Sequence, residues 1–182
     1  AVTGTDPTVV LRDNLLATTQ TSGGGVNAKS YAIGMVTTTF ANLDSNYNGF
    51  FSSGVNAGFF RSGSLTGGAG TDYPNLAGWQ AAVTDDANSF EADPLYTSTS
   101  DLHLLAGSPA LLAGTPVAGV TVDFDAETRS GIAPTVGADE VTVPADLSIT
   151  KTDGVTTAIP GGSLTYTITA SNAGSGPVSG AT

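Results

Sequence analysis

Short apolar runs, each broken by Asn, Asp or Gly, dominate residues 1–71. The runs at 9–16, 31–36 and 46–51 are long enough for strands and too short for packed helices. Because Asn readily bends the chain between two strands, the pattern predicts stacked coils whose backbone groups bond from one coil to the next. A β-sandwich of short strands joined by Asn and Gly turns fits the same pattern, since periodicity alone does not separate the two folds.

One stretch has a helical period instead. Its apolar face recurs at the spacing i, i+3, i+4, i+7 and consists of Leu76, Trp79, Gln80 and Val83. The sequence therefore predicts a helix over 76–83, opened by Pro74 or Asn75, which docks Trp79 over the open end of the coils. Beyond it, short strands are predicted at 93–96, 102–105 and 117–122, with a turn over 108–114.

The last part of the chain follows a strict two-residue alternation, which is typical of strands. The alternating apolar positions are Leu147 and Ile149 in one segment, and Leu164, Tyr166, Ile168 and Ala170 in the next. Thr and Ser occupy most positions between them, and Pro160-Gly-Gly forms the turn before the second segment. Two half-buried strands are therefore expected after a linker at 141–145.

The order of short motifs from Asp72 to Glu140 resembles the C-terminal end of a known fold. It includes Asp101-Leu-His-Leu-Leu, Asp123-Phe-Asp-Ala-Glu-Thr-Arg and Val136-Gly-Ala-Asp-Glu. Such an end caps the right-handed parallel β-helix of secreted bacterial surface proteins of the choice-of-anchor type. The resemblance implies β-helix coils and a cap over residues 1–140. This chain has Ala126 where that family often has Gly, which weakens the argument for a tight turn there.

Residues 146–182 resemble the opening of an immunoglobulin-like repeat found in tandem on bacterial and archaeal surface proteins. The motifs that carry this likeness are Asp146-Leu-Ser-Ile-Thr-Lys-Thr-Asp and Pro160-Gly-Gly-Ser-Leu-Thr-Tyr-Thr-Ile-Thr. A full repeat needs about 100 residues and seven strands, so only a partial β-sandwich is expected. The expected fold class is thus all-β: a right-handed parallel β-helix with a short capping helix, then a partial immunoglobulin-like sandwich.

Both ends of the chain read as incomplete on this interpretation. The chain is either a piece of a longer surface protein, or its copies complete one another by strand addition. In the second case a head-to-tail contact that does not close gives a fibre. The residues expected to mediate such self-assembly are Leu164, Tyr166, Ile168 and Ala170.

Charge and composition exclude several classes of binding partner and site. The chain has 16 acidic and 5 basic residues, a net charge of −11, so nucleic-acid binding is rejected and an anionic membrane surface is disfavoured. It has no cysteine, which excludes disulfides and thiolate metal sites. No apolar run approaches the ~20 residues of a membrane span. An extracellular or cell-surface setting is compatible with this acidic, Thr-rich composition.

Two candidate sites follow from particular side chains. Asp123, Asp125 and Glu127 are carboxylates at alternate positions, which could hold Ca²⁺, although an Asp pair with Arg129 is the simpler account. Calcium is the only cofactor considered. The resemblance to surface immunoglobulin-like domains also implies a covalent cross-link between Lys151 and Asn172, with a solvated strand lysine as the alternative.

Catalysis has little support in the sequence. His103, the only histidine, has no nucleophile elbow nearby, so a structural or surface role is expected. The acidic pairs Asp85-Asp86 (with Asp93) and Asp139-Glu140 could in principle cleave glycosides, but turn formation and helix capping explain them as well. Among the coils, the basic residues are Arg12, Lys29 and Arg61.

Aromatic residues of the coils leave two interpretations open, stacking inside the coils or a sugar-binding stripe. They are Tyr31, Phe40, Tyr47, Phe50, Phe51, Phe59 and Phe60.

The sequence favours a non-enzymatic structural module of an extracellular protein, for spacing, adhesion or fibre assembly. Its expected partners are itself or the rest of a longer protein. The alternative is a β-helix that binds or cleaves polysaccharide.

Overall fold

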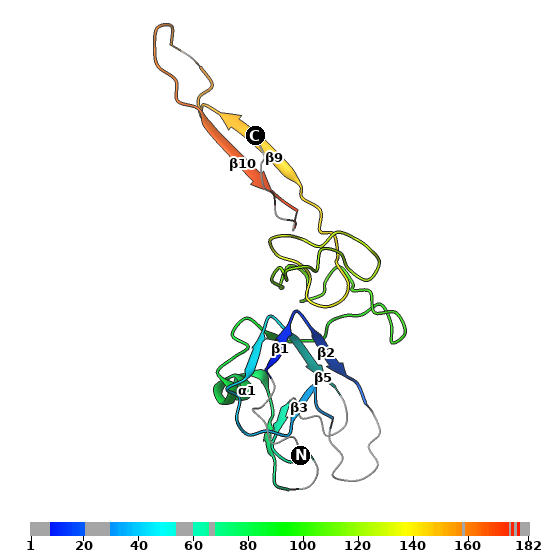
Figure 1. Cartoon of the computed structure of the whole chain (residues 1–182). Coiled ribbons are helices and arrows are strands. Elements are labelled where there is room, and N and C mark those ends of the chain that lie inside the picture. Colours follow the sequence, from blue (N-terminus) through cyan, green and yellow to red (C-terminus); the bar gives the residue numbers. More distant parts are fainter. Residues whose placement is uncertain are drawn as a thin grey trace. The chain divides into compact units, whose positions relative to one another are not determined.

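The structure, a computed structural model, is mostly β with one short helix and small parallel sheets (Figure 1). It describes residues 8–20, 30–53, 60–65, 68–157, 159–174, 176 and 178. The chain divides into two compact units, Ala1–Val141 (unit 1) and Thr142–Thr182 (unit 2).

Unit 1 contains eight short strands and the helix among its described residues. In chain order they are β1 (Val9–Arg12), β2 (Leu15–Thr18), β3 (Ile33–Met35), β4 (Leu43–Asn46), β5 (Gly49–Ser52), β6 (Phe60–Ser62), β7 (Thr71–Tyr73), α1 (Leu76–Val83) and β8 (Phe90–Glu91).

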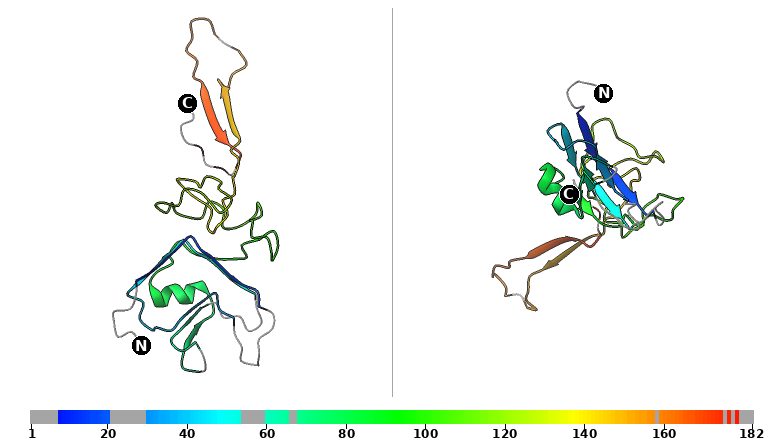
Figure 2. Two further views of the ribbon diagram at one scale, coloured as in Figure 1. Left: turned by 45° about the vertical axis from the view of Figure 1, so that its right-hand side comes forward. Right: turned by 90° about the horizontal axis from the view of Figure 1, so that it is seen from below.

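Three consecutive strands of unit 1 repeat, and each pairs in parallel with its counterpart. β1 pairs with β4, β2 with β5 and β3 with β6, with Val9 opposite Leu43, Leu15 opposite Gly49 and Ile33 opposite Phe60. β8 then adds in parallel to β5, whereas β7 adds to β6 in the antiparallel sense. Figure 2 shows the first two strands of each repeat meeting at an angle. The stacked short strands expected from the sequence are therefore present.

The bends between these strands fall at equivalent places in the two repeats. Asp13 between β1 and β2 has φ of 54°, and Tyr47 between β4 and β5 has φ of 57°. The sequence pattern predicted that Asn is the bending residue. The left-handed backbone conformation instead falls one residue earlier, at Asp13 before Asn14 and at Tyr47 before Asn48. The two asparagines instead join the repeats through their side chains, as shown by the bond from Nδ2 of Asn14 to Oδ1 of Asn48 at 3.1 Å.

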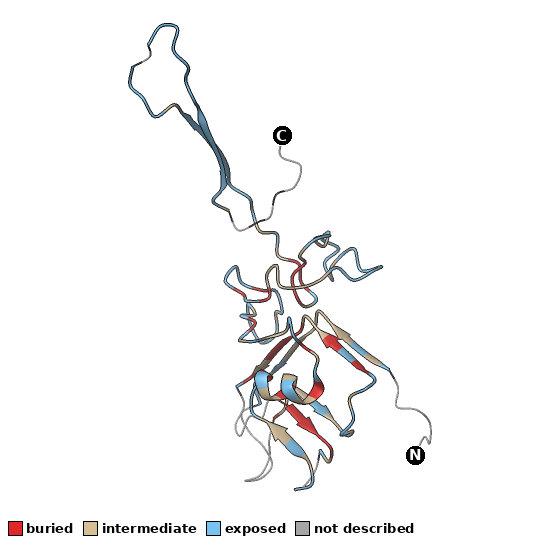
Figure 3. Ribbon diagram, turned by 90° about the vertical axis from the view of Figure 1, so that its left-hand side faces the viewer, coloured by how far each residue is buried: buried red, intermediate tan, exposed pale blue. Residues whose placement is uncertain are grey.

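The predicted helix is confirmed with the same bounds, and it delivers Trp79 to the core. Asn75 caps its start by accepting a hydrogen bond from the Gly78 N–H at 2.8 Å. Trp79 is fully buried and stacks on Phe60, with ring centroids 5.1 Å apart and planes 9° apart. Phe40 packs its ring edge-on at 5.4 Å. Figure 3 shows buried residues on the strands and on the helix that faces them.

The segment after β8 differs from the prediction. The strands expected at 93–96, 102–105 and 117–122 are wrong, because only isolated bridges join Tyr96 to Leu104 and Val122 to Thr128. Turns and bends occupy the rest, and the turn expected over 108–114 is found. A second small core of Leu104, Ala110 and Val136 supports these loops.

Unit 2 contains one antiparallel pair, β9 (Leu147–Thr152) with β10 (Thr167–Asn172). Every residue of both strands is exposed, so the prediction of half-buried strands is wrong for the isolated unit. Leu164 and Tyr166 precede β10 and lie outside the ladder. No second sheet faces this pair within the part of unit 2 that the structure describes. None of the described helices is long and apolar enough to cross a membrane.

Candidate functional site

The β9–β10 hairpin has one apolar and one polar face, and both are exposed. Residues directly opposite each other share a face in an antiparallel pair. Ile149 stands opposite Ala170 and Lys151 opposite Ile168, whereas Thr150 stands opposite Thr169 on the other face. Ile149 is 73% exposed and Ile168 is 62% exposed, although both are strand-forming apolar residues. The apolar hairpin face is the candidate functional surface, and it is exposed along its whole length (Figure 3). It consists of Leu147, Ile149, Ile168 and Ala170, with Asn172 at one end and Lys151 at the other.

The predicted assembly residues all lie in this part of the chain. Ile168 and Ala170 belong to the apolar hairpin face, and Leu164 and Tyr166 are exposed just before it. The Nζ atom of Lys151 lies 4.1 Å from the centroid of the Tyr166 ring, a cation–π contact. β9 contributes Leu147 and Ile149 to the same surface, which the predicted set left out. The alternation in 147–149 was the signal that could have added them.

Lys151 and Asn172, the predicted cross-link pair, are not brought together. Lys151 is paired with Ile168, whereas Asn172 is paired with Leu147 at the other end of β9. Four residues along a strand correspond to roughly 13 Å. The Asn172 amide is already used, because its Oδ1 accepts from the N–H of Asp146 at 2.9 Å and its Nδ2 donates to the Gly176 carbonyl at 2.7 Å.

Nor are the three carboxylates of the predicted calcium site brought together. The Asp123 carboxylate instead organises the turn, since it accepts from the backbone N–H groups of Asp125, Glu127 and Glu140 at 2.8–2.9 Å. Burial alone would raise the pKa of Asp123, but these donors and the charge of Arg129 together lower it below its usual value. Ala126 in the same turn has φ of 67°, in the left-handed region that favours glycine.

His103 lies between two carboxylates in an exposed position. Its Nδ1 is 2.5 Å from Asp101 Oδ1, and its Nε2 is 2.7 Å from Asp125 Oδ2. The hydrogen bond to Asp101, and after it the one to Asp125, raise the pKa of His103 to about 9. The same contact lowers the pKa of Asp101. The imidazolium form is therefore favoured at neutral pH, and no serine or threonine hydroxyl is hydrogen-bonded to the ring in the described structure.

One member of each acidic pair considered for glycoside cleavage, Asp86 or Glu140, forms hydrogen bonds within the fold. Asp86 is fully buried, and its carboxylate accepts from Ser45 Oγ at 2.8 Å, Ser89 Oγ at 2.7 Å and Trp79 Nε1 at 3.1 Å. Glu140 accepts from the N–H groups of Ser130 and Thr135 at 3.2 and 3.0 Å. Such bonds satisfy buried donors that no strand ladder reaches. No local sequence pattern indicated that Asp86 links α1 to β4.

The basic and aromatic residues of the predicted coils mostly form contacts within unit 1. Arg12 pairs with Asp44 at 2.5 Å, and Arg61 pairs with Asp72. Phe50 and Phe60 are fully buried and contact each other edge-on, as stacking inside the coils predicts. The remaining described aromatics of the set are partly buried: Tyr31, Phe40, Tyr47 and Phe51. Lys29 and Phe59 lie outside the described residues.

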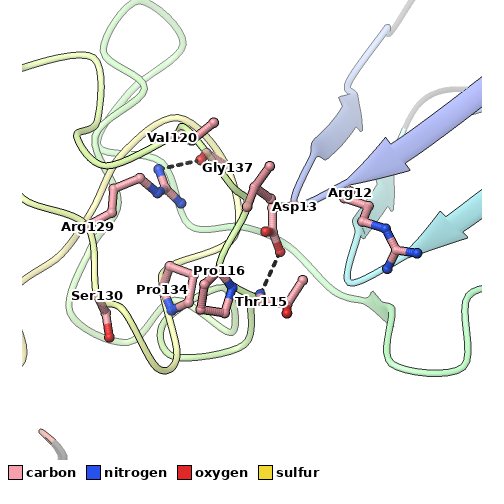
Figure 4. Close-up of a pocket in the computed structure, with 10 residues that line it drawn as sticks. Arg12, Asp13, Thr115, Pro116, Val120, Arg129, Ser130, Pro134 and Gly137 are labelled. Atoms are coloured by element: carbon pink, nitrogen blue, oxygen red, sulfur yellow. Dashed lines mark hydrogen bonds between the residues drawn. The ribbon is translucent and has the colours of Figure 1, made fainter.

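Several hollows lie in the described part of unit 1. One, of about 150 Å³, is lined by Arg12, Asp13 and Arg129 (Figure 4). Its polar groups are engaged: Asp13 accepts from the Thr115 N–H at 2.9 Å, and Arg129 donates to the Gly137 carbonyl at 3.0 Å. A hollow of this size is below that of ordinary small-molecule sites.

The second hollow, of about 520 Å³, lies where the β2–β5 sheet meets the loops after β8. Phe51 and Tyr96 contribute aromatic rings, and three leucines (Leu95, Leu102 and Leu105) extend its apolar lining. Asp93 is the single carboxylate among its described lining residues. Glycoside cleavage by the usual route uses a pair of carboxylates, so this hollow is suited to binding more than to hydrolysis.

Comparison with known proteins identified no relative of this chain. No protein-family model, no curated protein and no solved structure matches this chain.

Proposed function

We propose that this chain is a structural, non-enzymatic module of an extracellular surface protein or fibre. Unit 1 is interpreted as the last coils and cap of a right-handed parallel β-helix, and unit 2 as the opening of an immunoglobulin-like repeat. The module serves spacing, adhesion or head-to-tail assembly, and its partner is a second copy or the rest of a longer surface protein. The parallel repeat of β1–β3 on β4–β6 supports the first part of this interpretation.

The observation that carries the proposal is the apolar hairpin face of unit 2. Two strands cannot bury an apolar face by themselves, and an isolated hairpin is marginally stable in water. Ile149, Ile168 and Leu147 are all more than half exposed. Burying a side chain of this kind contributes about 1.5–3 kcal/mol, so the hairpin gains stability when another surface covers it.

Unit 1 offers a complementary feature. β1, β2 and β3 are each the outermost strand of their sheet among the described residues. An exposed strand edge presents unpaired N–H and C=O groups that accept a further strand. A hairpin that adds to such an edge on the next copy forms a heterologous contact, which propagates as a fibre if it does not close.

Sedimentation velocity of the full chain over a concentration series tests the proposal. Ile149→Lys with Ile168→Lys places charges on the apolar hairpin face, and the matched control, Thr150→Lys with Thr169→Lys, places the same charges on the polar face. We expect the unaltered chain and the control to form larger species as concentration rises, and the Ile149/Ile168 variant to stay monomeric. Monomers at every concentration in the unaltered chain, or equal loss in both variants, would contradict the proposal.

Polysaccharide binding is a second candidate, favoured by the 520 Å³ hollow with Phe51 and Tyr96. Aromatic rings stack on the apolar faces of sugars, and they dominate the energetics of many interfaces. Tyr96→Ala should then abolish retention of the chain on a panel of immobilised polysaccharides, whereas Tyr47→Ala, which lies outside the hollow, should keep it. No retention of the unaltered chain on any member of the panel would remove this candidate.

A further inference from the structure

Three side chains from separate loops of unit 1 converge on one point. One ligand-type atom each from His103, Asp125 and Asp139 lies within 4.8 Å of the other two. His103 follows the turn at 98–101, Asp125 belongs to the turn organised by Asp123, and Asp139 lies near the end of the unit. No local sequence pattern predicts that these three residues meet.

Asp139 is the unusual member of this cluster, because it is a buried carboxylate with little compensation. It is 6% exposed, and the one hydrogen bond that it accepts comes from the Leu104 N–H at 2.7 Å. No Lys or Arg of the described structure pairs with it. A buried carboxylate is costly unless it is paired with a cation or coordinates a metal.

The surroundings of His103 fix the ring so that Nε2 faces this cluster. Asp101 engages Nδ1, and the Phe124 ring packs against the imidazole with centroids 5.0 Å apart. A carboxylate on one ring nitrogen is the usual outer contact of a metal-bound histidine, because it orients the ring. A cation that binds at Nε2 displaces the proton that Nε2 otherwise shares with Asp125.

We propose that His103 Nε2 and one carboxylate oxygen each of Asp125 and Asp139 bind a divalent transition-metal cation such as Zn²⁺. One imidazole nitrogen with two carboxylate oxygens suits zinc and its neighbours better than Ca²⁺, which takes six to eight oxygens. The cation ties together three loops that no strand ladder joins. This inference does not depend on the proposed assembly function.

The fit requires small side-chain movements. Zinc lies about 2.0–2.2 Å from nitrogen and oxygen ligands in a tetrahedral site, so its ligand atoms stand roughly 3.3 Å apart. The Nε2–Oδ2 distance between His103 and Asp125 must therefore open from 2.7 Å. Both side chains are more than 40% exposed, which leaves them room to move.

Titration of the full chain with ZnCl₂ in a non-chelating buffer near neutral pH tests the proposal, followed by calorimetry and by NMR of the imidazole ring. His103 is the only histidine, so its ring signals report on the site without ambiguity. We expect one equivalent of Zn²⁺ to bind and to shift the ring signals. His103→Gln and Asp139→Asn should each lower the affinity at least tenfold.

Glu127→Gln is the matched control, because it removes one negative charge from the same acidic turn without touching the cluster. Zinc affinity within twofold of the unaltered chain is expected. Circular dichroism checks that each variant is folded, and the exposed His103→Gln variant keeps the test valid if Asp139→Asn unfolds. Three results would overturn the proposal: no stoichiometric binding, equal weakening by Glu127→Gln, or displacement of Zn²⁺ by millimolar Ca²⁺.

Discussion

The side chain of Asn48 holds Asn14 of the preceding repeat by two hydrogen bonds. Its Oδ1 accepts from the backbone N–H of Asn14 at 3.0 Å and from Nδ2 of Asn14 at 3.1 Å, across 34 residues of sequence. Asn48 is itself fully buried, and its Nδ2 donates to the Leu11 carbonyl at 3.0 Å. The bends of the two repeats are thus joined by side chains where the strand ladders are interrupted.

Loss of this bridge should destabilise unit 1. Asn48→Ala takes a hydrogen-bond partner from the partly buried N–H of Asn14 and from the carbonyl of Leu11, and a buried group left unsatisfied costs about 1–3 kcal/mol. We expect a fall in the free energy of unfolding of about 2–4 kcal/mol. Asn14→Ala should cost less, because Asn14 is only partly buried. Urea unfolding followed by the fluorescence of Trp79, the only tryptophan, measures both variants. Small and equal decreases in the free energy of unfolding of the two variants would show that the hydrogen bonds between Asn14 and Asn48 contribute little.

Replacing Ala126 with Gly should stabilise the turn at 123–127. Gly is the residue that the β-helix family resembled by this segment often has there. Ala126 has φ of 67°, so Ala126→Gly relieves a backbone conformation that costs an L-residue about 1–2 kcal/mol. Glycine loses more chain entropy on folding, about 0.4–1 kcal/mol, which offsets part of the gain. The net expectation is a small rise in the unfolding midpoint.

The opposite substitution provides the control for this turn. Gly119 has φ of 85° and nothing within 4 Å of an added Cβ, so Gly119→Ala adds strain without a clash. The unfolding midpoint should fall in this variant. If Ala126→Gly also lowers the midpoint, the left-handed conformation at Ala126 is not a source of strain.

The free energy of unfolding of unit 1 should decrease in mild alkali because His103 loses its proton there. The pKa of His103 is about 9 in the folded chain, above the ordinary histidine value of 6.5, so the folded state binds the proton more tightly. The stabilisation is complete below about pH 6.5 and is lost as pH rises through 9. The groups that face the ring are Asp101, Asp125 and, within 4.8 Å, Asp139.

An NMR titration of the single histidine in the presence of EDTA measures this pKa directly. Asp101→Asn should lower it most, because the bond to Asp101 is the largest cause of the shift. Thermal unfolding between pH 6 and pH 10 should show a decline that the His103→Gln variant lacks. A histidine that titrates near 6.5 would contradict the two-carboxylate geometry.

The sequence predicted the parts of this fold that rest on local pattern. Helix α1 was found with its bounds because Leu76, Trp79 and Val83 repeat at the helical period and Asn75 caps them. The stacked strands followed from short apolar runs around Asp13-Asn14. The loops after β8 were mistaken for strands, since Leu102 and Val117 stand in apolar stretches that the structure leaves as turns.

The candidate sites were less accessible to sequence reasoning because they depend on long-range contacts. Asp139 meets His103 across 36 positions, and nothing local marks that pairing. Asp123 was grouped with Asp125 and Glu127 by spacing, but backbone N–H donors pull its carboxylate into the turn. Alternation did predict that Ile168 and Ala170 lie on one face of a strand, because a two-residue period is local.

Negative-stain electron microscopy of the concentrated full chain tests the central claim, self-assembly through the apolar hairpin face, most directly. The account predicts ordered fibres with a repeat near the length of one subunit. Dispersed single particles at every concentration, with no ordered contact between copies, would contradict it.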